Sequence, residues 1–273
     1  MTGATWTKAR RKELALRFLS AAFLIPFALI VVWYGGAVSA AGCAFVGAIM
    51  AYEWVRMTNS PSMKILVSLA IVPSFVALFA GTLAGGGALI ICAILAGVTH
   101  PLASERFKSG FGLFYTAGMA LAVYALRVES QWDGWLATLI LMIIVWVSDS
   151  GAFFTGRTLG GPALTRISPS KTWSGAFGGI IFSVLAGFLV AHFVGGNGVY
   201  WGVAGGVISF AAQSGDMFES LMKRRLGVKD ASSLLPGHGG VMDRIDGLGA
   251  AAALALAVLL AFPSIVHALG IVR

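Results

Sequence analysis

Successive apolar runs, each of about 18 residues or more, recur from one end of the chain to the other, and each can cross a ~30 Å hydrocarbon core as a helix. Of the 273 residues, 58% are hydrophobic and only 11% are charged. That share of charge is too small to cover the surface of a soluble domain. The sequence therefore predicts an all-α polytopic membrane protein.

Hydropathy places about nine membrane-spanning helices in the chain. They are predicted over residues 18–34, 38–55, 65–81, 84–99, 111–126, 133–153, 175–195, 199–215 and 248–268. We divide them into an N-terminal region, 1–130, with about five spans and a basic cytoplasmic tail, and a C-terminal region, 131–273, with about four. The C-terminal region is expected to carry two large cytoplasmic loops, 154–174 and 216–247.

Lysine and arginine are distributed unevenly between the two sides of this predicted topology. All of them except Arg127 and Arg273 fall on the side that holds the N-terminus. Because Lys and Arg collect on the cytoplasmic side of membrane proteins, we expect the N-terminus to be cytoplasmic and the C-terminus to lie outside. The net charge of +8 then reflects orientation in the inner (plasma) membrane and attraction to anionic membrane lipids, and nucleic-acid binding is not needed to explain it.

Acidic residues gather around the two predicted loops. Six of the eleven lie in or beside them: Asp149, Asp216, Glu219, Asp230, Asp243 and Asp246. Acids this close to a membrane are costly unless they are paired or bind a cation, so they are candidates for a functional site. Asp243 and Asp246 would share one face of a helix that began there, and Asp216 follows the eighth apolar run. Two helix ends can therefore aim carboxylates at one point.

The chemistry of the 216–247 loop favours a magnesium ion. Carboxylate oxygens, with no Cys and one His nearby, suit Mg²⁺ and not zinc, and Mg²⁺ is usually shared with substrate phosphates. A nucleotide or a phospholipid is therefore the expected co-ligand. Glycines allow backbone N–H groups to approach an anion closely, and basic side chains bind phosphate. The loop supplies both: Gly237, Gly239 and Gly240, and Lys223, Arg224, Arg225, Lys229 and Arg244.

The 154–174 loop and the end of the preceding span predict a second half of the site. Asp149 ends an apolar run, so it is expected to be paired or metal-bound. Arg157 and Lys171 can bind phosphate, and Ser168 and Thr172 offer hydroxyl groups. Lys171 and Thr172 do not belong to a P-loop, because Ser170 stands where that motif requires glycine.

The residues of both loops resemble a known family. Ser220-x-x-Lys223-Arg224-x-x-x-x-Lys229-Asp230, followed by Pro236-x-His238-Gly239-Gly240-x-x-Asp243-Arg244-x-Asp246, is similar to the signature of phosphatidate cytidylyltransferases. Ser148-Asp149, Gly156-Arg157 and Ile167-Ser168-Pro169-x-Lys171-Thr172 also resemble that family. The resemblance implies an enzyme that takes CTP and phosphatidic acid, releases CDP-diacylglycerol and pyrophosphate, depends on a divalent metal and forms a homodimer.

The resemblance also implies roles for individual residues. The catalytic residues would be Asp216, Asp243, Asp246, Lys223 and Arg244. Asp216 and Asp243 would be the primary Mg²⁺ ligands, with Asp246 and Asp149 as further ones, and the crowding of acids leaves room for a second cation. Substrate would be bound by Lys171, Arg157, Ser168, Thr172, Ser220, Arg224, Lys229, His238, Gly239 and Gly240.

Two other functions are compatible with parts of this pattern. A CTP-dependent polyprenol or lipid-alcohol kinase would have similar loops and would release CDP. A membrane transporter would place ionisable residues near the bilayer midplane, whereas here the acids gather at the predicted cytoplasmic edge.

Overall fold

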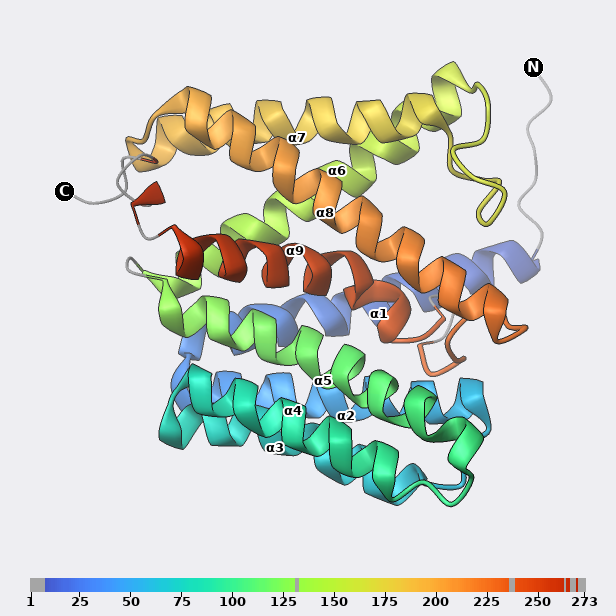
Figure 1. Ribbon diagram of the computed structural model, residues 1–273. Coiled ribbons are helices and arrows are strands. Elements are labelled where there is room, and N and C mark those ends of the chain that lie inside the picture. The colour runs from blue at the N-terminus through green and yellow to red at the C-terminus, as the bar shows by residue number, and fades with distance from the viewer. Residues whose placement is uncertain (1–7, 131–132, 236–238, 263, 266–268, 270–273) are drawn as a thin grey trace.

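The chain folds into an all-helical structure, as its hydropathy predicts (Figure 1). The computed structural model describes residues 8–130, 133–235, 239–262, 264–265 and 269. Over these residues it contains nine α-helices and a short 3₁₀ turn at Ala103–Glu105. The α-helices are α1 (Lys8–Tyr34), α2 (Gly36–Thr58), α3 (Met63–Ala80), α4 (Thr82–Val98), α5 (Arg106–Glu129), α6 (Gly134–Leu159), α7 (Trp173–Val194), α8 (Gly198–Arg225) and α9 (Met242–Ala261).

Six helices are long and apolar enough to cross a membrane, so the chain is a multi-pass membrane protein. They are α2, α3, α5 with its preceding 3₁₀ turn, α6, α7 and α9. Shorter apolar stretches occupy Phe18–Tyr34 of α1 and all of α4. Helix α8 falls outside this group because glycine, serine and glutamine dilute its apolar residues. Each of the nine predicted spans falls on one helix; which side of the membrane each end faces stays a prediction.

The two large loops are shorter than predicted. Helix α6 continues to Leu159, α8 continues to Arg225 and α9 begins at Met242, so the connecting segments are 160–172 and 226–241. Hydropathy detects only the apolar part of a helix, whereas Glu, Lys, Arg and Met continue a helix well beyond it. Helix α9 ends at Ala261, because Pro263 disfavours helical backbone in the residue before it. Residues 263 and 266–268 of the predicted last span lie outside the described residues.

Helix α5 lies between two groups of helices. Figure 1 shows α2, α3 and α4 on one side of it and α9 on the other, with α6, α7 and α8 beyond α9. The largest hydrophobic core contains residues of α2 to α5, and it also contains Ala231, Val241 and Met242 from the 226–241 segment and the start of α9. The N-terminal helices and this segment therefore share one core.

Helices α7 and α8 pack closely through glycine. A Cβ atom on Gly205 would lie 2.2 Å from the backbone oxygen of Ser183, and one on Gly187 would lie 2.1 Å from that of Trp201. Backbone cannot move aside as a flexible side chain can. Small residues are needed wherever two helices in a membrane approach this closely.

We expect Gly205→Ala to lower the free energy of unfolding by about 1–3 kcal/mol, because the added methyl group forces α7 and α8 apart. Thermal unfolding in detergent micelles measures this loss. Gly87→Ala in α4 is the matched control, since a Cβ there meets nothing within 4 Å, and its effect should stay within about 0.5 kcal/mol. Equal midpoints for the two variants would contradict the close packing of α7 on α8.

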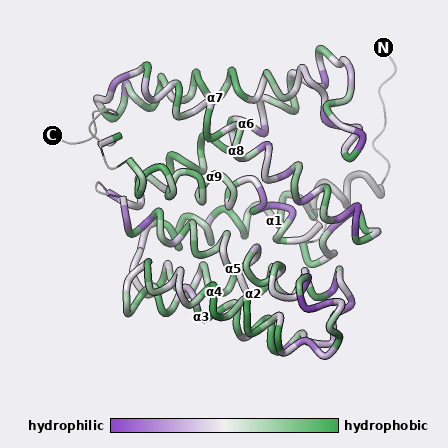
Figure 2. Tube along the Cα trace, in the orientation of Figure 1, coloured by the Kyte–Doolittle hydropathy of each residue, from purple (hydrophilic) through white to green (hydrophobic). Residues whose placement is uncertain are grey.

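Hydrophilic residues from several helix ends gather at one end of the bundle. Figure 2 shows that most of the helical trace is hydrophobic, and that the 160–172 segment and the charged end of α8 lie at the same end of the bundle. The start of α9 faces this end as well. Charged residues that are far apart in the sequence thus meet there.

Candidate active site

A cavity of about 1230 Å³ opens at this end of the molecule. It contains side chains from both halves of the predicted site. The predicted site residues that line it are Asp149, Arg157, Ser168, Lys171, Thr172, Asp216, Ser220, Lys223, Asp243, Arg244 and Asp246. The structure therefore joins the two halves in one cavity.

Another part of the cavity lining is apolar. It is formed by residues of α1 and α2, among them Leu24, Val31 and Val46, and by Trp146 and Phe153 of α6. A ligand in this cavity can therefore have a charged part and an apolar part.

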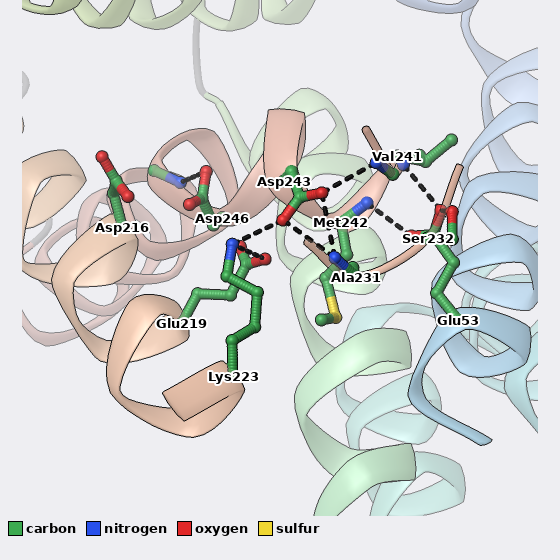
Figure 3. Close-up of polar contacts among 12 residues, drawn as sticks. Glu53, Asp216, Glu219, Lys223, Ala231, Ser232, Val241, Met242, Asp243 and Asp246 are labelled. Carbon is green, nitrogen blue, oxygen red and sulfur yellow. Dashed lines mark hydrogen bonds and ion pairs between the residues drawn. The ribbon is translucent and has the colours of Figure 1, made fainter. Parts of the chain in front are cut away.

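Lys223 lies at the centre of the charged wall. Its ammonium group contacts the Glu219 carboxylate at 3.0 Å and forms a short ion pair with Asp243 Oδ1. Glu219 lies one turn before Lys223 on α8, whereas Asp243 comes from α9 (Figure 3). Lys223 is only 9% exposed. Water therefore scarcely reaches this cluster, and the ammonium group compensates the charge of the two carboxylates.

Asp243 also organises the backbone around it. Its Oδ2 accepts hydrogen bonds from Gly240 N at 2.7 Å and from Ala231 N at 3.1 Å. Gly239 and Gly240 have a structural reason to be glycine here. Gly239 has a φ of +82°, and a Cβ on it would lie 2.7 Å from Asp243 Oδ2, so a side chain would be both strained and crowded.

Glu219 was not assigned a role from the sequence. It is fully buried, and the Lys223 ammonium at 3.0 Å is the contact that compensates its carboxylate. Burial, and then the nearby negative charge of Asp246, raise the pKa of Glu219 above its ordinary value. Its position one turn from Lys223 was the available signal, since side chains four residues apart meet on a helix.

Lys171 and Asp216 join the two halves of the site directly. The Lys171 ammonium, from the segment between α6 and α7, forms an ion pair with Asp216 Oδ2 of α8. Asp246, on α9, accepts a hydrogen bond at 2.7 Å from Gly247 N through one oxygen. Asp149 of α6 lines the same cavity, where its negative charge and those of Asp216 and Asp246 repel one another.

Three of the residues predicted to bind substrate also make local contacts. Thr172 caps the start of α7, where its side chain accepts a hydrogen bond from Gly175 N at 3.1 Å. Ser168 donates its backbone N–H to Thr165 Oγ1 at 3.3 Å, which shapes the 160–172 segment. Arg157, in the last turn of α6, lies over the ring of Phe153. These contacts hold the cavity-lining residues in place.

Four predicted binding residues do not line the cavity. Arg224 and Lys229 are exposed, Gly240 donates its backbone N–H to Asp243, and Gly239 lies so close to Asp243 that a Cβ would crowd it. His238 lies outside the described residues.

Glu53 is a second acid that sequence reasoning left out. It lies on α2 and is fully buried, and its carboxylate accepts hydrogen bonds from the start of α9 (Figure 3). A signal for it existed, because an ionisable residue inside an apolar span is a functional candidate by default. It lies in the predicted second span, far from the acids of the two loops.

The carboxylates of this cavity suit a hard cation. Asp149, Asp216 and Asp246 offer oxygen ligands from three helices. Over the described part of the chain, no three His, Cys, Asp or Glu side chains converge closely enough to hold a metal by themselves. Mg²⁺ rarely uses such an all-protein cage; it is commonly bound by one or two carboxylates together with substrate phosphates. The residues present therefore fit Mg²⁺ bound jointly with a nucleotide.

Comparison with known proteins agrees with this geometry. A phosphatidate cytidylyltransferase of Brucella suis is 39% identical over 251 residues, which cover 89% of this chain and 92% of that protein. One of Pseudomonas aeruginosa is 32% identical over 264 residues, covering 89% and 96%. One of Haemophilus influenzae is 41% identical over 163 residues, covering 56% and 55%. The model of the cytidylyltransferase family matches residues 15–262. The chain therefore belongs to the cytidylyltransferase family.

Proposed function

We propose that this protein is a phosphatidate cytidylyltransferase, which converts CTP and phosphatidic acid into CDP-diacylglycerol and pyrophosphate. The observation that carries the proposal is the single cavity that joins ion-paired acids and bases to an apolar wall. Such a cavity suits a reaction between a polyanionic nucleotide and the phosphate of a lipid. The names of the relatives supply the same substrates.

The reaction needs positioning and charge neutralisation more than proton transfer. An oxygen of the phosphatidate phosphate, already anionic at neutral pH, attacks the α-phosphorus of CTP, and the bond from that phosphorus to the oxygen of the β-phosphate breaks in line. Lys171, Arg157 and Arg244, which line the cavity, bind the triphosphate and the lipid phosphate. Lys223 keeps Asp243 and Glu219 in place beside them.

Mg²⁺ is the proposed cofactor. Asp216 would hold it together with Asp246, and not with Asp243 as the resemblance implied, because Lys223 and two backbone N–H groups already engage both Asp243 oxygens. Asp149 and Asp243 would be further ligands, and the crowding of acids leaves room for a second cation. The ion would neutralise charge on the phosphates of CTP. Lys171 pairs with Asp216 in the structure, so its ammonium is placed to move from the carboxylate to a phosphate when CTP enters.

The proposed setting is the inner membrane, with the site on the cytoplasmic side, where CTP is available. The distribution of Lys and Arg supports this orientation. A homodimer is proposed from the family resemblance, and chemical cross-linking in native membranes tests it.

Purified protein supplied with phosphatidate, Mg²⁺ and CTP labelled in the cytosine ring is expected to form labelled CDP-diacylglycerol. ATP, GTP and UTP should give about 100-fold less product, because a site built to hydrogen-bond one base leaves its polar groups unpaired with another. Thin-layer chromatography of the lipid fraction measures the product. Removing Mg²⁺ with EDTA should abolish it, and restoring Mg²⁺ should recover it.

The same assay separates the alternatives. A lipid-alcohol kinase would transfer the γ-phosphate of CTP to a polyprenol and leave labelled CDP in the aqueous phase. Transport of substrate into liposomes without any labelled lipid would instead favour a transporter. Either result would refute the proposed function.

A further inference from the structure

The Glu53 carboxylate connects α2 to two segments at the edge of the cavity. Its Oε1 accepts hydrogen bonds from Val241 N at 2.8 Å and from Ser232 Oγ at 2.6 Å, and its Oε2 accepts one from Met242 N at 2.7 Å. Figure 3 shows these contacts on the side of Asp243 opposite Lys223. The side chain is fully buried, so it has been removed from water to make them.

These contacts provide hydrogen-bond partners for N–H groups at the start of α9. The first N–H groups of a helix have no partner within the helix, and negative charge there is stabilising. In α7 and α8 a residue at the helix start, Thr172 or Asn197, provides the cap. Val241 provides no side-chain cap for α9. The cap comes instead from Glu53 on α2, which lies 188 residues before Val241 in the sequence.

The fit leaves no room for a side chain at the neighbouring position. A Cβ on Gly240 would lie 2.6 Å from Glu53 Oε1 and 3.0 Å from the Cβ of Ala231. The glycine of the sequence signature therefore allows α2 to approach the backbone of this segment.

Both segments held by Glu53 also hold Asp243. Gly240 N, next to Val241, donates to Asp243 Oδ2, and Ala231 N, next to Ser232, donates to both carboxylate oxygens. Asp243 itself follows Met242 in the first turn of α9. A shift of either segment would therefore change where Asp243 meets Lys223.

We infer that Glu53 is a positioning residue for the cytidylyl-transfer site: from the N-terminal helices it fixes the start of α9 and the 231–232 segment, and so aligns Asp243 and Lys223. It does not line the cavity, so it acts without touching substrate. The inference rests on the proposed function for its activity readout alone.

The test uses the full-length protein in lipid nanodiscs. Glu53→Gln replaces one acceptor oxygen by an NH₂ group that faces an N–H donor, so one buried amide loses its partner. We expect kcat to fall about tenfold while KM for CTP changes less than about threefold. Hydrogen exchange should accelerate at residues 240–243 and stay unchanged in α3 and α4. Ser232→Ala, which removes one of the three donors, should give a smaller change of the same kind.

Glu129→Gln is the matched control, since Glu129 is a partly buried carboxylate of α5 that accepts a hydrogen bond from the Thr82 hydroxyl. It should leave kcat and exchange at 240–243 within about twofold of wild type. Wild-type kcat and exchange in Glu53→Gln would overturn the inference. So would an increase in exchange that is equal in α3, α4 and 240–243, since that would mean general destabilisation. Exchange needs no turnover, so an inactive wild-type protein would refute the proposed function and still leave Glu53 testable.

Discussion

The Lys223→Met variant is expected to lose about 100-fold or more of its kcat/KM for CDP-diacylglycerol formation and to unfold at a lower temperature. Lys223 is the shared partner of Glu219 and Asp243. Removing one member of a buried ion pair leaves an uncompensated charge at a cost of about 3–5 kcal/mol. The two carboxylates must then take up protons or move apart, and Asp243 loses its alignment. Assays with labelled CTP and thermal unfolding in micelles measure the two effects.

Arg225→Met is the control for that experiment. Arg225 is two residues further along α8, is exposed and does not line the cavity. The Arg225→Met substitution also removes one positive charge, so any general effect of lowering the net charge appears in both variants. A Lys223→Met protein that kept more than about a tenth of wild-type kcat/KM would show that the Lys223 cluster is dispensable.

The Lys171→Met variant is expected to behave differently, with a large loss of activity and little loss of stability. Lys171 and Asp216 are partly exposed, at 28% and 42% of their side-chain surface, and ion pairs of this kind contribute only about 0–1 kcal/mol to folding. A phosphate contact in the transition state is worth more, about 1.5–3 kcal/mol for a charged hydrogen bond. We expect kcat/KM for CTP to fall about 10- to 100-fold, with an unfolding midpoint close to that of wild type.

Arg166→Met tests whether the Lys171 effect is specific. Arg166 belongs to the same segment, is exposed and is absent from the cavity lining. Its activity should stay within about twofold of wild type. If Lys171→Met lowered stability as strongly as Lys223→Met, the Lys171–Asp216 pair would be a structural contact and not a substrate site.

The positions of the helices could be predicted from the sequence, but not their charged ends. Hydrocarbon imposes a minimum length of apolar residues, so each predicted span coincides with a helix. The same signal stops where the apolar residues stop, although the helix does not. Asp216, Glu219 and Lys223 therefore lie on α8 and not in a loop, which sets their spacing at one turn; Asp216 and Lys223 line the cavity, and Glu219 is buried beside Lys223.

Only the part of the site that lies in local sequence motifs could be predicted. Acids and bases clustered in two segments identified Lys171, Asp216, Lys223 and Asp243 as candidates, and the structure places them around one cavity. The contact of Glu53 with Val241 could not be predicted in this way, because nothing in a single sequence marks a hydrogen bond between residues so far apart. Such a pair depends on the packing of α2, α5 and α9 against one another.

The amides at the start of α9 have a consequence for how an incoming triphosphate is recognised. Those of Gly240, Val241 and Met242 are already committed to Asp243 and Glu53, so these three N–H groups are not available to bind a phosphate. In the proposed function, the triphosphate is therefore bound chiefly by the long, pivoting cations that line the cavity, Lys171, Arg157 and Arg244. Such cations can follow a phosphate chain as its length and geometry change from triphosphate to departing pyrophosphate, which a fixed amide nest could not do.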